Sequence, residues 1–386
     1  MTAPLSEFAE HVIGLKHGES VHDLLLDHTK ISWYKDRVQA WERGERIAPV
    51  TMDVAWTRQC QAACSFCAAM TQAHSSEGRI TKKIAFEFLE DAAEIGVRGI
   101  SLISDGESSI VPWYEDSIEY ASKLGIKIGI GTNGLRLKRP MLERILPHIS
   151  YLRFNFSAGS RQRYAEIMGV KSKFYDEVLQ NIRDAMDIKR RDNLPLNINM
   201  QMVVAPHLNG DEIMNFANLC AEVRPDYGIM KHCADDSQGS IGVNYADYDK
   251  YYDDFKRAEA LSDDTFRMVM KWSRVQNNGV RQYHRCYGVP FLLQLSGTGL
   301  LGPCGPMFNE KFKKFHCGSI VEQRFKKIWE SDRYWEVVDY LANEHDPSTM
   351  CPPNCLQTNT NQWLWDYKHG KKEFNEGPMP THAEFL

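Results

Sequence analysis

Three cysteines lie close together, Cys60, Cys64 and Cys67, with the spacing C-x3-C-x2-C. They follow an apolar, strand-like run at residues 50–56. Three thiolates on one short loop can hold three irons of a [4Fe–4S] cube, which leaves the fourth iron without a protein ligand. A small chelating molecule can bind that open iron and receive an electron. Structural zinc is the alternative, but zinc normally takes four protein ligands, often from C-x2-C pairs, and suits a lone triplet poorly.

A second group of cysteines lies in the last third of the sequence. Its five members are Cys286, Cys304, Cys317, Cys351 and Cys355. The first two flank an apolar, glycine-bearing stretch at residues 291–301 that is typical of a β-hairpin. A helical run at residues 321–342 separates them from the close pair at the end. A hairpin pair and a distant close pair can bring four thiolates to one metal centre, either an iron–sulfur cube or zinc.

The composition is that of an ordinary soluble globular protein. The 386 residues are 43% apolar and 25% charged, with a formal net charge of −5. Without a basic run, this balance gives no reason to expect a nucleic-acid partner. The first ten residues do not resemble a signal peptide, and no apolar stretch is long enough to span a bilayer. We therefore expect a cytoplasmic protein with no membrane partner, whose clustered cysteines bind metal or act in redox chemistry rather than form disulfides.

The elements that must position these thiols alternate between strands and helices from residue 49 onward. After the cysteine loop, strands are expected at 99–103, 127–130, 151–156, 197–204 and 226–231. Helices are expected at 82–94, 112–124, 140–148, 174–190 and 210–221. Six β/α units predict an α/β fold, a partial (β/α)6 TIM-like barrel with its site at the C-terminal ends of the strands. A doubly wound open sheet is the alternative that this alternation allows.

The placement of polar residues favours the barrel. Five of them come just after a predicted strand: Cys60, Asp105, Asn133, Ser157 and Asp235.

The expected domains are an N-terminal helical extension, the barrel, a connecting segment, a small cysteine-rich C-terminal domain and a tail that is either ordered or frayed. Their boundaries are 1–48, 49–235, 236–280, 281–365 and 366–386.

The cysteine loop and the turn Ser104-Asp105-Gly106-Glu107, one β/α unit later, together resemble the radical S-adenosylmethionine (radical SAM) superfamily. Members commonly carry a Gly-Gly-Glu-like motif at this turn, which holds the amino group of the methionine moiety. Here Asp105 replaces the first glycine, while Gly106 and Glu107 remain. Gly106 matters because only a residue without a Cβ lets the backbone come so close to a ligand. The replacement leaves open whether the Asp105 side chain also meets the cofactor.

The resemblance implies further cofactor-binding residues. The turn that contains Asn133 is similar to a Thr-Asn-Gly turn common in these barrels, although the geometry of a tight turn alone also explains it. Relatives present polar groups from the end of the fourth strand to the ribose and carboxylate of the cofactor, and Ser157 is favoured there over Asn155. Phe66, between two of the cysteines, is expected to present its backbone to the adenine edge.

The second cysteine group resembles the C-terminal twitch or SPASM extensions of radical SAM enzymes. The series that houses a further cluster in full SPASM domains is missing. The resemblance therefore implies one auxiliary [4Fe–4S] cluster with four ligands, Cys286, Cys304, Cys351 and Cys355. Cys317 is the surplus thiol and the alternative ligand. Zinc stays the alternative metal, because the spacing does not exclude it.

Three residues at the end of the sixth strand are candidates for catalysis: Lys231, Cys233 and Asp235. Lys231 or Asp235 would bind or deprotonate a substrate hydroxyl, and Cys233 would donate a hydrogen atom to a substrate radical. The alternative is structural, with Cys233 as a small buried residue and the acid in solvent.

The resemblance implies that the reduced first cluster cleaves S-adenosylmethionine to methionine and a 5′-deoxyadenosyl radical, which takes a hydrogen atom from an inert C–H bond. The short form with one auxiliary cluster looks like carbohydrate and aminocyclitol dehydrogenases and epimerases. We therefore expect a sugar or cyclitol alcohol, oxidised or epimerised in polysaccharide or natural-product biosynthesis, with a flavodoxin or ferredoxin as reductant. A peptide-modifying enzyme is the alternative within the superfamily, and a non-catalytic iron–sulfur electron carrier is the alternative from another class.

Overall fold

The computed structural model describes residues 29–71, 74, 77–236, 238–272, 280–351 and 355–386. One sheet contains the strands in the order β10-β9-β8-β1-β2-β3-β4-β5-β6-β7. Its parallel run comprises β1 (Thr51–Val54), β2 (Gly99–Leu102), β3 (Lys127–Thr132), β4 (Tyr151–Asn155), β5 (Asn197–Val204), β6 (Tyr227–His232) and β7 (Arg267–Met270). Because this order never reverses, the strands wind as in a barrel and not as in a doubly wound sheet. The predicted partial barrel is confirmed, and β7 adds a strand to the predicted six.

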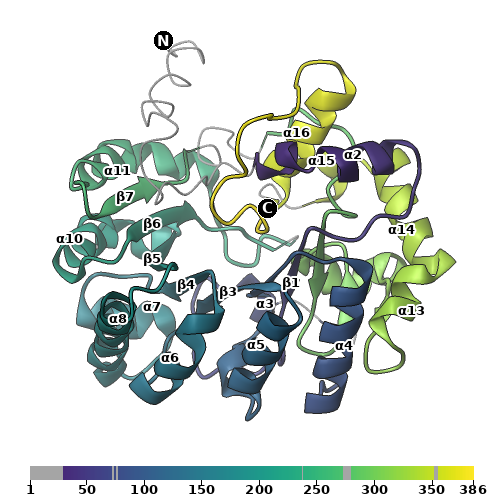
Figure 1. The fold of residues 1–386 in the computed structure, drawn as a ribbon. Coiled ribbons are helices and arrows are strands. Elements are labelled where there is room, and N and C mark those ends of the chain that lie inside the picture. The colour runs from purple at the N-terminus through teal and green to yellow at the C-terminus, as the bar shows by residue number, and fades with distance from the viewer. Residues whose placement is uncertain (1–28, 72–73, 75–76, 237, 273–279, 352–354) are drawn as a thin grey trace.

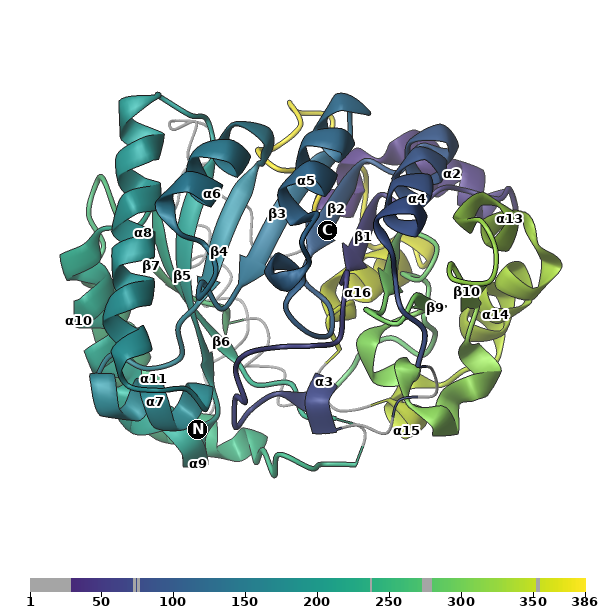
Figure 2. The same cartoon turned by 90° about the horizontal axis from the view of Figure 1, so that it is seen from below.

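Helices between successive strands cover the outer face of the sheet (Figure 1, Figure 2). They include α4 (Lys82–Ile95), α5 (Tyr114–Lys123), α6 (Arg139–Ile145), α7 (Arg161–Met168), α8 (Lys173–Arg191), α10 (Ile213–Val223) and α11 (Tyr252–Glu259). The short helix α3 (Ala68–Thr71) follows the cysteine loop and lies apart from this layer (Figure 2). At the start of α4, Thr81 caps the helix by accepting a hydrogen bond from the Ile84 N–H, and Gly96 ends it in a left-handed conformation. The apolar face between these caps, with Phe88 and Leu89, is buried in the main core.

After the barrel, the chain returns to the opposite edge of the sheet. Strand β8 (Leu292–Leu295) pairs in parallel with β1 and antiparallel with β9 (Leu300–Gly302), which confirms the predicted hairpin. Strand β10 (Gly318–Ser319) pairs with β9. The helices that follow are α13 (Phe325–Glu330), α14 (Asp332–Asn343), α15 (Pro347–Met350) and α16 (Thr358–Lys368). The cysteine-rich part of the chain therefore continues the barrel sheet.

Strand β3 has glycines where large side chains of β4 need room. A Cβ on Gly129 would lie 2.2 Å from the ring of Tyr151, and a Cβ on Gly131 would lie 2.9 Å from the guanidinium of Arg153. The Tyr151 hydroxyl reaches the Ser101 hydroxyl on β2, at 2.9 Å. The absence of side chains at these two positions of β3 thus lets two large polar residues of β4 lie inside the barrel.

The C-terminal residues 382–386, here called the barrel floor, lie across the N-terminal ends of the strands (Figure 1). The Thr51 hydroxyl on β1 donates to the Glu384 carbonyl (2.7 Å) and accepts from the Leu386 N–H (3.0 Å). His382 Nε2 lies 2.7 Å from the amide oxygen of Asn197 on β5. The end of the predicted tail is therefore ordered.

The described part of the predicted N-terminal extension supports the barrel floor. It contains a short helix, η1 (Lys30–Trp33), and α2 (Lys35–Glu42), whereas residues 1–28 lie outside the described residues. Lys30 Nζ donates to the carbonyls of His382 (2.9 Å) and Phe385 (3.0 Å). Among the residues that the structure describes, no helix has the length and apolar character needed to cross a membrane.

Candidate active site

The loop that carries the first cysteine group follows β1 and is held by the end of α7. The N–H groups of Ala63 and Ser65 donate to the carbonyls of Met168 (3.1 Å) and Ile167 (2.9 Å). Gly169 has φ +62°, and a Cβ there would lie 2.3 Å from the Ala63 carbonyl oxygen. A residue with a side chain does not fit this close approach. The shape of the cysteine loop is therefore fixed by backbone contacts with another helix.

The three thiols of this loop share one environment. A hydrogen bond from the Cys67 N–H to the Cys64 carbonyl (3.1 Å) closes a tight turn. Burial raises the pKa of Cys64, and the neighbouring thiols of Cys67 and Cys60 raise it further. The pKa of Cys60 is raised as well, chiefly by burial. Three thiolates this close together repel one another, and a bound cationic centre relieves that repulsion.

Glu107, in the turn after β2, links the cysteine loop to the turn after β3. Its buried carboxylate accepts hydrogen bonds from the Asn133 N–H (2.8 Å) and the Thr132 hydroxyl (2.9 Å). Its own N–H donates to the Gln59 carbonyl (2.9 Å). Burial raises the pKa of Glu107, and the hydrogen bonds that it accepts oppose this. The Asn133 side chain lies 3.5 Å from Cys60 Sγ, so three predicted site residues meet at this point.

Gly106 lies where the turn after β2 approaches the cysteine loop. It has φ +91°, and a Cβ there would lie 2.1 Å from the Thr57 carbonyl oxygen. Both the backbone conformation and the close approach therefore require glycine.

The Asp105 side chain joins the barrel to the β8–β9 hairpin. Its carboxylate, which is 2% exposed, accepts hydrogen bonds from the Ser296 hydroxyl (2.7 Å) and the Gly297 N–H (2.8 Å). The guanidinium of Arg58 lies 3.3 Å away and forms an ion pair with it. The residue that departs from the Gly-Gly-Glu-like motif thus has a structural task.

Ser157 and Phe66 lie beside a small apolar cluster that is separate from the main core. The cluster consists of Val203, Ala205 and Cys233, and Phe66 packs against it. The fully buried Ser157 hydroxyl accepts a hydrogen bond from the Val203 N–H (3.2 Å). These predicted cofactor-binding residues therefore adjoin an apolar surface next to the cysteine loop, where a flat aromatic group would fit.

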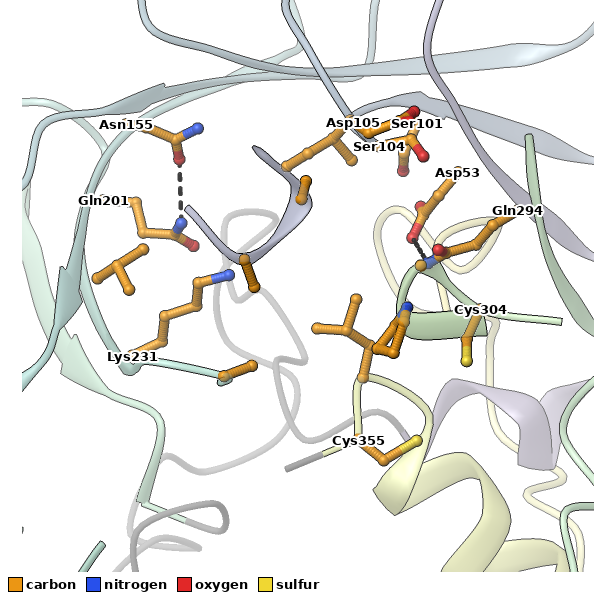
Figure 3. Close-up of a pocket in the computed structure, with 18 of the residues that line it drawn as sticks. Asp53, Ser101, Ser104, Asp105, Asn155, Gln201, Lys231, Gln294, Cys304 and Cys355 are labelled. Carbon is orange, nitrogen blue, oxygen red and sulfur yellow. Dashed lines mark hydrogen bonds between the residues drawn. The ribbon is translucent and has the colours of Figure 1, made fainter. Parts of the chain in front are cut away.

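A cavity of about 450 Å³ lies inside the barrel (Figure 3). Phe66 and Cys67 line it on the side of the first cysteine group, and Cys304, Cys351 and Cys355 line it on the side of the second. The barrel floor contributes further lining residues. Its polar lining includes Asp53, Ser101, Tyr151, Arg153, Asn155, Asn199, Gln201, Lys231, Lys271 and Gln294. The volume lies in the range of small-molecule sites.

Asp53 on β1 is an acid inside the cavity that sequence reasoning missed. Its carboxylate accepts a hydrogen bond from the Gln294 amide (3.1 Å; Figure 3). Burial raises the pKa of Asp53 to about 6, against the opposing effect of Arg153. A carboxyl group with this pKa changes protonation close to neutral pH, as acid–base catalysis requires. The sequence carries one signal for this acid, because Asp53 stands between two apolar residues, Met52 and Val54, both of which are fully buried.

Lys231 and Cys233, at the end of β6, both line the cavity. The Lys231 ammonium group points into it beside Gln201 (Figure 3). The Cys233 Sγ lies 3.9 Å from the Phe66 carbonyl oxygen. Burial raises the pKa of Cys233 to about 12, so this thiol stays protonated at neutral pH. A protonated thiol is the form that can donate a hydrogen atom.

Asp235, the third predicted catalytic residue, holds the loop that follows β6. Its carboxylate accepts hydrogen bonds from the N–H groups of Asp236 (2.8 Å), Ile241 (2.9 Å) and Val243 (3.0 Å). Its side chain is buried, and both of its oxygens are engaged. This bonding gives Asp235 a structural task, and its catalytic role stays a prediction.

Four cysteines of the second group act on one another electrostatically. Burial is the largest cause that raises the pKa values of Cys286 and Cys304, and the thiols of Cys355 and Cys351 raise both further. Burial also raises the pKa of Cys351 to about 12. These four are the expected ligands of the auxiliary cluster, and the structure brings them into one region.

Cys317 lies apart from these four. It is 2% exposed, and its Sγ lies 3.7 Å from the Phe315 carbonyl oxygen. Burial raises its pKa to about 12, and the charge of Arg333 opposes this. Over the described residues, no group of three or more His, Cys, Asp or Glu side chains is arranged to hold a single metal ion. The ligand sets named from the sequence therefore stay predictions.

Comparison with known proteins identifies the barrel. The family model described as Radical SAM superfamily matches residues 54–220. The AdoMet-dependent heme synthase of Methanosarcina barkeri is 22% identical over 296 residues, which cover 72% of this chain and 82% of that protein.

Two solved structures share the fold. Streptococcus suis SuiB bound to S-adenosylmethionine superposes with a TM-score of 0.61 at 14% identity, over 91% of this chain and 79% of SuiB. The enzyme anSMEcpe with bound AdoMet superposes with a TM-score of 0.53 at 12% identity, over 86% of this chain and 94% of that one. The family match spans most of the barrel and contains the cysteine loop and the Gly106-Glu107 turn, so residues 54–220 form a radical SAM domain.

Proposed function

We propose that this radical SAM enzyme oxidises an alcohol carbon of a small sugar or cyclitol held in the barrel cavity. The observation that carries the proposal is the extent of that cavity, which is lined by Cys67 of the first cysteine group and by Cys304, Cys351 and Cys355 of the second. A substrate between two redox centres can lose a hydrogen atom on one side and an electron on the other. The cavity volume of about 450 Å³ suits a small polar molecule.

The family implies a [4Fe–4S] cluster and S-adenosylmethionine as cofactors, and the residues present fit them. Cys60, Cys64 and Cys67 would hold the cluster, and their mutual repulsion is a reason for a cation to bind there. The Gly106-Glu107 turn and the apolar cluster beside Phe66 would hold S-adenosylmethionine. Bound in this way, the two cofactors would supply one-electron chemistry that removes a hydrogen atom from an unactivated C–H bond, and an auxiliary cluster held by the second cysteine group would supply an electron acceptor.

The chain itself supplies the proton acceptor. Loss of a hydrogen atom and an electron from an alcohol carbon gives a ketone only when the hydroxyl proton also leaves. Asp53 lies in the cavity with a pKa raised to about 6, so it is largely ionised at neutral pH and can take that proton. Lys231, whose charge acts on Asp53, would orient the hydroxyl group.

Epimerisation is the second candidate, and Cys233 is the observation that favours it. This thiol stays protonated at neutral pH and lies beside Phe66 of the cysteine loop. It could return a hydrogen atom to the opposite face of the substrate carbon. The two outcomes differ in whether the product is a ketone or a stereoisomer.

The first experiment is a screen of sugars, cyclitols and peptides for deoxyadenosine release by the anaerobically reconstituted enzyme. We expect release with a sugar or cyclitol alcohol. With that substrate in deuterated water, oxidation predicts a ketone, no solvent deuterium at the reacting carbon, and an active Cys233→Ala variant. Deuterium at that carbon together with an inactive Cys233→Ala variant would establish epimerisation instead. Deoxyadenosine release with peptides alone would refute the sugar proposal. Absence of release with every sugar, cyclitol and peptide would indicate an electron carrier.

A further inference from the structure

Arg153 places a positive charge inside the barrel. The residue lies on β4, and its guanidinium occupies the room that Gly131 leaves on β3. Within the described part of the chain, the buried Nε atom of Arg153 has no hydrogen-bond partner. Its charge acts on Asp53 across the cavity, but the two do not come close enough for an ion pair. A guanidinium in this setting is suited to bind an anion.

Two amide oxygens on the neighbouring strand β5 also lack donors. Asn199 pairs in register with Arg153, and Gln201 is the next residue of β5 on the same face. Asn199 is 3% exposed and Gln201 is 1% exposed, and neither side-chain oxygen has a hydrogen-bond partner among the described residues. Buried acceptors without donors cost free energy, and a ligand that carries hydroxyl or amino groups would satisfy them.

The charges around the cavity favour a negative ligand. Lys231 and Lys271 line it together with Arg153. Four acids line it as well. The carboxylates of Asp105, Asp235 and Asp236 accept hydrogen bonds from backbone N–H groups, whereas Asp53 accepts one from the Gln294 amide and faces the cations. Figure 3 shows Gln201 and Lys231 on one side of the cavity and Asp53 on the other. Gln201, a hydrogen-bond acceptor, and Lys231, a cation, therefore face the Asp53 carboxylate across the cavity, and a small molecule would fit between them.

We propose that the substrate is an acidic sugar, whose carboxylate or phosphate is bound by Arg153 and whose hydroxyl groups donate to Asn199 and Gln201. This inference rests on the proposed function and names the class of its substrate. It assigns the anionic end of the molecule to β4 and β5, so the alcohol carbon extends toward Asp53 on β1.

The test measures equilibrium binding to the reconstituted full-length chain, with S-adenosylmethionine present, by isothermal titration calorimetry. The probes are D-glucuronate, D-glucose 6-phosphate and the neutral control D-glucose. We expect at least one anion to bind about tenfold or more tightly than glucose, because charge-assisted hydrogen bonds exceed neutral ones. The anion that binds more tightly identifies the group bound by Arg153 as a carboxylate or a phosphate. Failure of both anions to bind more tightly than glucose would overturn the proposal.

Variants locate the anion. Arg153→Gln should weaken anion binding about tenfold to a hundredfold and leave glucose binding unchanged. Arg139→Gln, which removes an arginine that pairs with Asp187 on the surface, is the control and should bind like the parent. Asn199→Asp keeps Arg153 and supplies an internal carboxylate beside it, so it should weaken anion binding even if Arg153→Gln does not fold. Undiminished anion binding in Asn199→Asp and in a folded Arg153→Gln variant would refute the assignment.

The two proposals fail in distinguishable ways. Anion-selective binding through Arg153 with no deoxyadenosine release from any substrate would remove the proposed function and keep the anion site. Turnover of neutral sugars, with binding that does not depend on Arg153, would keep the function and remove the anion site.

Discussion

The Nε2 atom of His345 lies 3.2 Å from the Sγ atom of Cys351, one of the four proposed ligands of the auxiliary cluster. His345 is fully buried, and its Nδ1 atom has no hydrogen-bond partner among the described residues. Burial lowers the pKa of His345 to about 4, so the ring is neutral at pH 7 and carries one N–H. Because the described residues offer Nδ1 no acceptor, we assign that proton to Nε2, where it faces the sulfur.

We predict that His345→Ala lowers the reduction potential of the auxiliary cluster. A hydrogen bond to a ligand sulfur stabilises the reduced, more negative state. Loss of about 1 kcal/mol corresponds to roughly 40 mV for a one-electron couple. A redox titration followed by electron paramagnetic resonance measures the shift. His316→Ala is the control, because His316 Nε2 bonds to the Met307 carbonyl. Equal potentials in the two variants would contradict the prediction.

The first cysteine group should account for half of the bound iron. Two [4Fe–4S] clusters give about eight irons per chain after anaerobic reconstitution. Replacement of Cys60, Cys64 and Cys67 by Ala should leave about four and abolish deoxyadenosine formation. Cys220→Ala, a change of a fully buried thiol in α10, is the matched control and should keep all of the iron. Unchanged iron in the triple variant would mean that this loop does not hold a cluster.

The surplus thiol can be separated from the auxiliary ligands by the same assay. Cys317 has no electrostatic link to the other four cysteines of its group, so Cys317→Ala should keep about eight irons per chain. Cys351→Ala should lose the auxiliary cluster and keep about four. Loss of iron in the Cys317 variant would place that residue in the ligand set.

Asp53 should make stability depend on pH. Burial raises its pKa from 3.8 to about 6, so the folded state holds the proton more tightly than the unfolded chain. Folding therefore carries a cost that is fully present above pH ~6 and disappears as the pH falls below about 4. The difference between the two pKa values corresponds to about 3 kcal/mol at most. Asp53→Asn should raise the free energy of unfolding at pH 8 by up to that amount, with a gain that shrinks toward pH 5 in urea titrations.

Catalysis should depend on the same residue in the opposite sense. The ionised carboxylate accepts the proton, so turnover of the parent enzyme should rise with pH through about 6, whereas Asp53→Asn should be inactive. The pH profile of deoxyadenosine release with the substrate found by screening measures this. A variant with the parent's activity and pH profile would remove Asp53 from the mechanism.

Local patterns were enough to predict the barrel. The alternation of apolar strands with amphipathic helices carries its own signals, such as the Thr81 cap and the left-handed Gly96 at the two ends of α4. The three cysteines Cys60, Cys64 and Cys67 lie within one β/α unit of the Gly106-Glu107 turn, so short-range spacing was sufficient to relate them. Electrostatic proximity of the second cysteine group is consistent with the expected ligand set, which stays a prediction.

Residues whose roles depend on distant partners could not be assigned from the sequence. Asp105 bonds to Ser296, 191 positions later, so no local pattern reveals that its carboxylate holds a hairpin. Asp235 follows a strand as a catalytic residue would, but the loop that folds back onto it supplies backbone donors as far as Val243. Asp53 lines the cavity because of the register and curvature of the whole sheet. The residue pattern within β1 alone does not predict that register or that curvature.

The contact between the barrel floor and β1 bears on the order in which the protein is made and folded. Thr51 bonds to Glu384 and Leu386 across sequence separations of 333 and 335 residues. Contacts this distant in sequence form late, because the loop they close is long. During synthesis, β1 emerges long before the segment that contacts its N-terminal end. The nascent barrel is therefore open at the N-terminal ends of its strands until the barrel floor has been made.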